Sequence, residues 1–160
     1  MTLYFAIKFL HVVGAAVLLG TGAGIAFFML MAHLRGDPAV IAGVARIVVV
    51  ADVLFTATAV VLQPLTGIWL AWHVGYSLLD GWIALSILLY LVTGVFWLPV
   101  IWMQIRMRDL AVEAAELGLK LPRSYHRLFT PWFAFGIPAF AAVLTIFWLM
   151  IARPDISMSP

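Results

Sequence analysis

The chain opens with an apolar stretch long enough to cross a lipid bilayer. From Phe9 to Met31, every residue except His11 and Thr21 is apolar or glycine. About 20 apolar residues in a helix span the hydrocarbon core, and backbone polar groups are satisfied there only in helices or closed barrels. Comparable stretches follow along a chain that is 66% hydrophobic and only 10% charged. The sequence therefore predicts an all-α integral membrane four-helix bundle.

We expect one membrane domain, residues 1–160, whose spans lie at about residues 3–31, 41–72, 81–104 and 128–151. The first span is too long for a cleaved signal peptide, and Lys8 lies inside it rather than before it. The expected connections with positive charge are residues 32–40 and 105–127.

Helix-ending signals mark the two charged connections. The sequence Arg35-Gly36-Asp37-Pro38 marks the first of them. Gly36 suits the C-cap of the first helix, Asp37 suits the N-cap of the second, and Pro38 suits the first position of the second helix. Residues 111–117 are expected to continue the third helix beyond the membrane, with Glu116 and Lys120 spaced for an i,i+4 ion pair.

The distribution of positive charge predicts the orientation. The chain has nine Lys and Arg residues. All except Lys8 and Arg153 lie in or near the connections after the first and third spans: Arg35, Arg46, Arg106, Arg108, Lys120, Arg123 and Arg127. The positive-inside rule places those connections in the cytoplasm. The N- and C-termini are then on the periplasmic side of a bacterial inner membrane that the chain crosses several times.

Composition also excludes several functional classes. The chain has no cysteine, so disulfides, thiolate metal sites and a cysteine nucleophile are absent. Its positive charges are few and follow the loops, which indicates a lipid bilayer as the surroundings and no nucleic-acid partner. Gly20 and Gly24 have the small-xxx-small spacing of close helix packing, and this face predicts a homodimer.

His11 is the leading candidate for a functional residue. Hydrocarbon penalises an ionisable group unless a partner or cavity receives it. Leu18 shares its helical face and Gly14 borders it, so a flat ligand or a second backbone can approach. Gln63, in Gln63-Pro64-Leu65-Thr66-Gly67, lies next to a proline that frees a backbone carbonyl and kinks the helix. The amide repairs that kink or belongs to a site.

Haem b is the sharpest hypothesis for this region, because membrane four-helix bundles hold haem between spans through imidazole. His11 is then the iron ligand, with Gly14, Leu18, Gln63 and His73 as the other candidate cofactor-binding residues. His73 lies at the outer surface, at a different depth from His11, so five-coordinate haem or another second ligand fits better.

Other interpretations stay open. His11 is also compatible with a packed polar residue in a non-catalytic assembly protein, a scaffold or a small-solute transporter. Copper(I) is a further alternative, because Met29 and His33 share one helical face, Met103 and Met107 share another, and His126 lies on the same side. Asp52 is expected to pair with Arg106 or a neighbouring arginine at the inner boundary.

Several motifs resemble a bacterial integral membrane family known as domain of unknown function 2269. The resemblance covers nearly the whole chain and rests on Lys8-Phe9-Leu10-His11, Gly20-Thr21-Gly22, Gln63-Pro64-Leu65-Thr66-Gly67, Phe96-Trp97-Leu98-Pro99-Val100, Gln104-Ile105-Arg106-Met107-Arg108 and Pro138-Ala139-Phe140.

The chain is more distantly similar to HemJ-type protoporphyrinogen oxidases and to the membrane part of CopD-type copper-resistance proteins. HemJ-type proteins also carry lysine-x-x-histidine in the first span, which implies haem b at His11. Their third span has a lysine soon after a Gly-Trp pair, whereas Gly81-Trp82 leads here into Ala84-Leu85-Ser86. The enzyme activity is therefore not carried over. The leading hypothesis is a haem b-binding redox-type module with a quinone or another membrane redox protein as electron partner.

Overall fold

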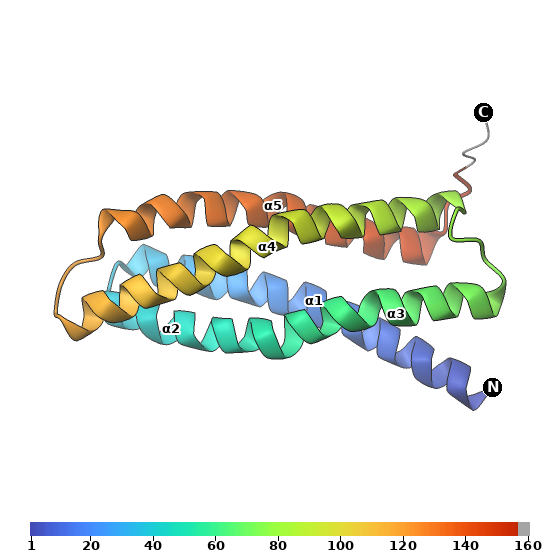
Figure 1. Cartoon of the computed structure of the whole chain (residues 1–160), viewed down its shortest axis with the longest axis horizontal. Helices are drawn as coiled ribbons and strands as arrows, with labels where there is room; N and C mark the ends of the chain where they lie inside the picture. Colours follow the sequence, from blue (N-terminus) through green and yellow to red (C-terminus); the bar gives the residue numbers. More distant parts are fainter. Residues whose placement is uncertain (157–160) are drawn as a thin grey trace.

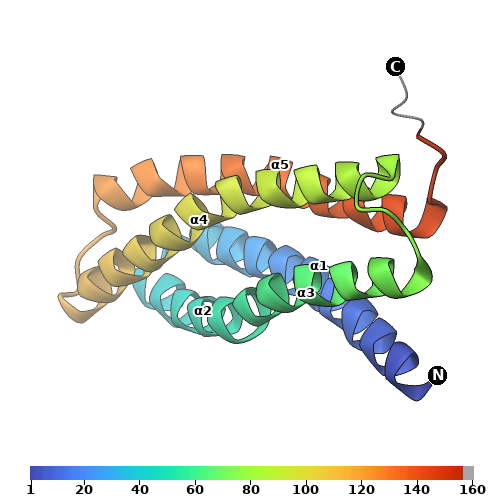
Figure 2. The same cartoon turned by 45° about the vertical axis from the view of Figure 1, so that its right-hand side comes forward.

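The structure is a computed structural model that describes residues 1–156. It contains helices α1 (Thr2–Arg35), α2 (Pro38–Ala51), α3 (Ala57–Val74), α4 (Gly81–Glu116) and α5 (Arg123–Ala152), with a π-helical turn, η1 (Asp52–Thr56), between α2 and α3 (Figures 1 and 2). Because α2, η1 and α3 run on as one helix, there are four helices long and apolar enough to cross a membrane. No strand occurs among residues 1–156. The all-α, four-span prediction is confirmed.

The turn between α1 and α2 forms as its residues dictate. Gly36 ends α1 in the left-handed conformation (φ 69°), and its N–H donates to the His33 carbonyl. The Asp37 carboxylate accepts a hydrogen bond of 2.8 Å from the Ala39 N–H, and Pro38 occupies the first turn of α2. This caps one of the donors that a helix start leaves without an intrahelical partner.

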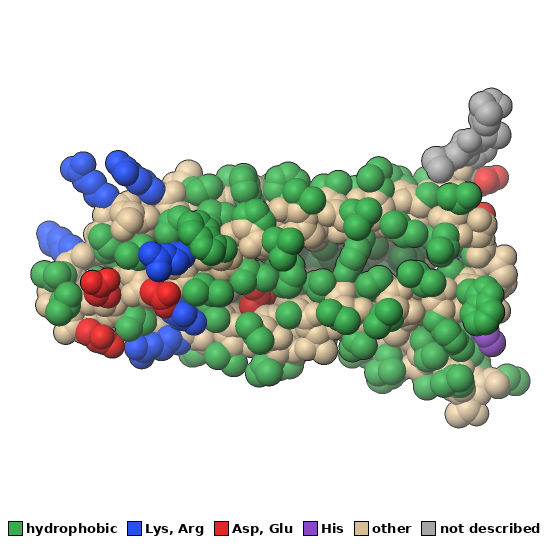
Figure 3. Space-filling view, viewed as in Figure 1, with side chains coloured by type: hydrophobic (Ala, Val, Ile, Leu, Met, Phe, Trp, Pro, Cys, Tyr) green, Lys and Arg blue, Asp and Glu red, His purple; other side chains and the backbone are tan. Residues whose placement is uncertain are grey.

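Charge gathers at one end of the bundle, which we call the charged end: the α1–α2 turn and the connection between α4 and α5. Figure 3 shows the Lys, Arg, Asp and Glu side chains of this face concentrated there, while the rest is mostly apolar. The main buried core lies near the same end and joins α1, α2, α4 and α5 through residues that include Met29, Ala45, Met107, Tyr125 and Phe129. The helices are therefore packed most tightly here.

One predicted ion pair at this end is wrong. Helix α4 continues to Glu116, as expected, but Gly118 takes a positive φ of 64° and the chain leaves the helix before Lys120. Glu116 pairs instead with Arg46 of α2 at 3.7 Å. Both side chains are exposed, so the pair contributes little stability.

The opposite end, which carries both described ends of the chain and the α3–α4 connection, is more loosely built (Figures 1 and 2). We call it the terminal end. There α3 packs on α1, and α4 packs on α5, but no Cα atom of α3 comes within 8 Å of α4 or α5. Figure 3 shows the surface hollowed between α3 and α4. The terminal half thus consists of two helix pairs that diverge from a common core.

The Gly20/Gly24 pair does not pack against another helix. A Cβ atom at Gly20 would meet nothing within 4 Å, and one at Gly24 would meet only Phe28 of the same helix. Homodimerisation through this face stays a prediction.

Candidate functional site

The His11 imidazole lies against α3 in the terminal half of the bundle. Its Nδ1 atom is 2.8 Å from the Thr66 hydroxyl oxygen. That hydroxyl directs its single hydrogen to backbone carbonyls one turn back, at 2.7 Å from Leu62 and 3.2 Å from Gln63. When the hydroxyl hydrogen bonds to one of these carbonyls, the hydroxyl oxygen accepts from the imidazole, and Nδ1 carries the proton. A neutral His11 then has its lone pair on Nε2.

The Nε2 atom remains available. It makes no hydrogen bond within residues 1–156, and it is not among the side-chain atoms that are fully enclosed without a partner. An imidazole oriented through one nitrogen, with the other free, is the arrangement that protein ligands of metals adopt.

Two glycines permit the close approach of α1 and α3. A Cβ atom at Gly67 would lie 3.1 Å from Cε1 of His11, and one at Gly14 would lie 2.5 Å from Nε2 of Gln63. Each helix thus presents a glycine to the polar side chain of the other. This reciprocal fit lets Gln63 Nε2 donate to the His11 carbonyl at 2.9 Å.

Gln63 does not repair the proline kink, because its amide bonds to the backbone carbonyl of His11. Pro64 lies inside α3 and leaves the Val60 carbonyl without its usual N–H donor. The Tyr90 hydroxyl of α4 donates to that carbonyl. The sequence indicates the free carbonyl but not the residue that satisfies it.

The other candidates are placed differently. His73 is exposed near the end of α3, where its ring stacks on Trp69 (4.8 Å between centroids) and Tyr4 (5.4 Å). It is held in an aromatic stack, and no contact joins it to His11. Leu18 is half-buried further along α1.

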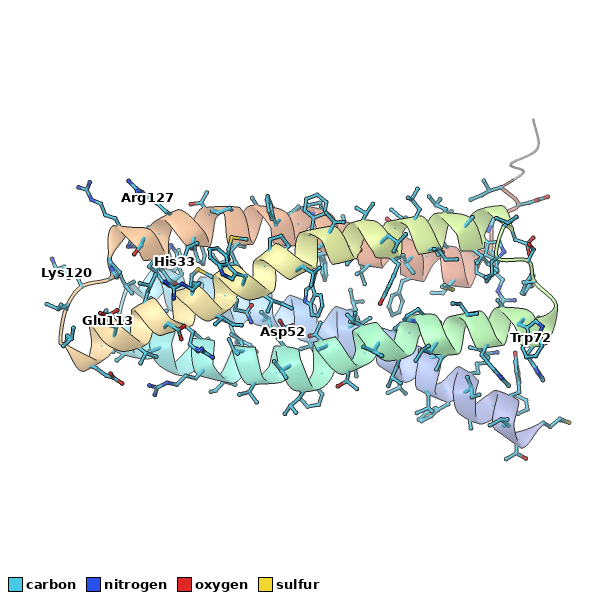
Figure 4. The ribbon with its side chains drawn as sticks, viewed as in Figure 1. His33, Asp52, Trp72, Glu113, Lys120 and Arg127 are labelled. Carbon is cyan, nitrogen blue, oxygen red and sulfur yellow. The ribbon has the colours of Figure 1, made fainter. Side chains whose placement is uncertain are left out.

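The residues of the copper hypothesis gather at the charged end. Met29, Met103 and Met107 are buried in the same core. Figure 4 labels His33, which stacks on Phe129 with 3.6 Å between ring centroids and lies edge-on to His126 at 5.7 Å. In the described part of the chain, no group of three or more His, Cys, Asp or Glu residues could hold a metal ion. Because the copper hypothesis rests on methionine thioethers as well, it stays a prediction.

Asp52 does not pair with Arg106. Ion pairs in residues 1–156 join Arg46 to Glu116 and Arg108 to Asp109. Asp52 is instead buried within the bundle, with 6% of its surface exposed.

Comparison with known proteins identified one family. The model of a family described as "Predicted integral membrane protein (DUF2269)" matches residues 5–154. The searches of curated proteins and of solved structures found no match.

Proposed function

The chain belongs to the DUF2269 family of integral membrane proteins, and we propose that its four spans form a redox-type module that binds haem b through Nε2 of His11. The single observation that carries the proposal is the hydrogen bond from Nδ1 of His11 to Thr66. It fixes the orientation of the ring and leaves the ligating nitrogen free.

The surroundings of His11 fit a flat apolar cofactor. The helix pairs α1–α3 and α4–α5 diverge at the terminal end, and α3 stays more than 8 Å from α4 and α5 between Cα atoms. Gly67 brings the α3 backbone against the Cε1 side of the imidazole, so a cofactor would approach Nε2 from another side. Haem b, when bound, would supply one-electron chemistry whose potential depends on its axial ligands and on the apolar walls around it.

The protein's own residues have defined tasks in this proposal. Thr66 orients the imidazole, and its hydroxyl bond to the Leu62 carbonyl keeps it an acceptor toward His11. Gln63 ties the His11 backbone to α3. His73 is engaged with Trp69 and Tyr4, so we propose His11 as the only imidazole ligand from this chain. A quinone or another membrane redox protein would exchange electrons with the module.

Bound pigment tests the proposal. The protein is purified in detergent after expression with ample haem, and a dithionite-reduced minus oxidised visible spectrum is recorded for wild type, His11→Ala and His73→Ala. We expect a sharp reduced band in wild type and His73→Ala but not in His11→Ala. A colourless wild-type protein would refute haem binding.

Thr66→Val tests the orienting role. Loss of the partner of a ligating histidine typically weakens binding about 10–100-fold, so a haem titration should show weaker binding while the band shape is retained. If Thr66→Val binds haem as wild type does, Thr66 has no orienting role.

A colourless protein would favour the second candidate, a non-catalytic assembly or solute-transport protein. The specific observation behind it is that both polar groups opposite His11, the Thr66 hydroxyl and the Gln63 amide, already bond to that residue. His11 would then be a packing residue between α1 and α3. The His11→Ala variant would lose stability and nothing else.

A further inference from the structure

The Asp52 carboxyl lies in the interior of the bundle at an unusual point of the backbone. It begins the π turn η1, and Thr56 ends that turn. Each has 6% of its surface exposed. Figure 4 shows Asp52 between the α2–α3 helix and α4, away from Glu113 and Lys120 at the charged end. Thr56 and, from α4, Trp97 are its polar neighbours. Single π turns inside α-helices are frequent at functional sites.

This acidic group has no basic partner in the part of the chain that the structure describes. Arg46 precedes it by about 9 Å along the helix, at about 1.5 Å per residue, but pairs with Glu116. Arg108 pairs with Asp109. An unpaired carboxylate is costly inside a protein and more so in a bilayer. Thr56 and Trp97 offset part of this cost as polar neighbours of the carboxyl, and a small cation bound beside the carboxylate would offset more of it.

Thr56 adds a second oxygen at the same place. Its hydroxyl is buried, and the group it faces is the Asp52 carboxyl, although the two do not reach ordinary hydrogen-bond geometry. A buried hydroxyl without a partner costs free energy, because it gives up its bonds to water. Oxygen atoms of carboxylates, hydroxyls and backbone carbonyls are the ligands that hard cations prefer, and irregular turns in membrane helices supply such oxygens.

We propose that Asp52 and Thr56 form a binding site for a small monovalent cation, H⁺ or Na⁺, inside the bundle. One carboxylate neutralises one positive charge, whereas Ca²⁺ or Mg²⁺ sites use more oxygen ligands or several waters. A proton would bind to a carboxylate oxygen, with the Thr56 hydroxyl as its hydrogen-bond partner. A sodium ion would bind between the carboxylate and hydroxyl oxygens. The site is separate from His11 and does not depend on the haem proposal.

Carbodiimide labelling tests the site and distinguishes the two cations. Dicyclohexylcarbodiimide reacts with protonated carboxyl groups in apolar surroundings. The full-length protein, prepared without sodium in detergent, is labelled in choline chloride or in sodium chloride of equal ionic strength, and labelled positions are found by mass spectrometry. We expect label on Asp52 and none on exposed Asp37. Slower labelling in sodium assigns Na⁺, and equal labelling assigns H⁺. An unlabelled Asp52 in both salts overturns the proposal.

Two threonines offer a matched comparison for the second ligand. Thr56 is buried, whereas Thr58, on the same helix, is exposed. If sodium protects Asp52, Thr56→Val should raise the half-protecting concentration about tenfold, equivalent to about 1.4 kcal/mol, and Thr58→Val should not. If the cation is a proton, Thr56→Val should change the labelling rate and Thr58→Val should leave it unchanged. Identical behaviour of the two variants removes Thr56 from the site.

Discussion

The contact between Tyr90 and the α3 backbone gives the sharpest test of how the two helix pairs are joined. Pro64 removes the N–H that would bond the Val60 carbonyl, and the Tyr90 hydroxyl donates to it instead. Tyr90→Phe keeps the ring and removes only this donor. We expect a lower free energy of unfolding, because the carbonyl then has no donor within reach.

The size of the effect follows from the position of the carbonyl. A buried polar group left without a partner costs about 1–3 kcal/mol, whereas side-chain hydrogen bonds between membrane helices average about 0.6 and reach about 1.7 kcal/mol. Pro64 rules out the usual replacement bond within α3, so we expect about 1–2 kcal/mol. In a Pro64→Ala background the alanine supplies the missing N–H. The cost of Tyr90→Phe should then fall to about 0.5 kcal/mol or less.

The two substitutions therefore form a double-mutant cycle with a coupling energy of about 1 kcal/mol. Reversible unfolding in mixed detergent micelles, titrated with sodium dodecyl sulfate, measures the four variants. Tyr4→Phe is the matched control, because the Tyr4 hydroxyl makes no hydrogen bond in residues 1–156. The same cost for Tyr90→Phe with and without Pro64 would refute the assignment of Tyr90 as the partner of the freed carbonyl.

Three further substitutions test the packing by the same unfolding assay. Gly14→Ala places a Cβ atom 2.5 Å from the Gln63 amide nitrogen and should cost about 1 kcal/mol, because the hydrogen bond from Gln63 to the His11 carbonyl is lost. Gly22→Ala, whose Cβ atom would meet nothing within 4 Å, should be neutral or stabilising. Equal effects of the two substitutions would contradict the close approach of α1 and α3. Asp37→Ala should cost about 0.5–2 kcal/mol through loss of the α2 cap, whereas Asp37→Asn should retain most of it. Met107→Ala empties a fully buried position and should cost about 2–5 kcal/mol; a loss under 1 kcal/mol would mean that the core collapses into the space.

Local sequence signals predicted the parts of the fold that local chemistry determines. The four apolar stretches indicated the four long helices, and Gly36, Asp37 and Pro38 each took the role that its backbone preference indicates. The consequence of Pro64 was predictable for the same reason, since a proline always removes one N–H.

The pairing of side chains across helices was not predictable in this way. Whether His11 faces Thr66 or another residue depends on the depth at which α1 crosses α3, and Gly14 and Gly67 determine that depth only together. Tyr90 carries no feature that distinguishes it from an interfacial tyrosine.

Charged residues were misassigned for a related reason. The i,i+4 spacing suggested Lys120 as the partner of Glu116. Because α4 ends at Glu116, this side chain instead pairs with Arg46 of α2. The π turn at Asp52 leaves no mark in the hydrophobic pattern.

That turn also bears on how the family can vary in length. A π turn holds one residue more than the α-helical turn it replaces, and Val53, Leu54 and Phe55, which occupy its middle, are exposed. A homologue lacking one of these three could form a continuous α-helix. Val48, before the turn, and Gln63, after it, would then still face their present neighbours. We therefore expect single-residue insertions and deletions among relatives to accumulate here, and those that lack the extra residue to hold the carboxyl and hydroxyl groups three positions apart instead of four.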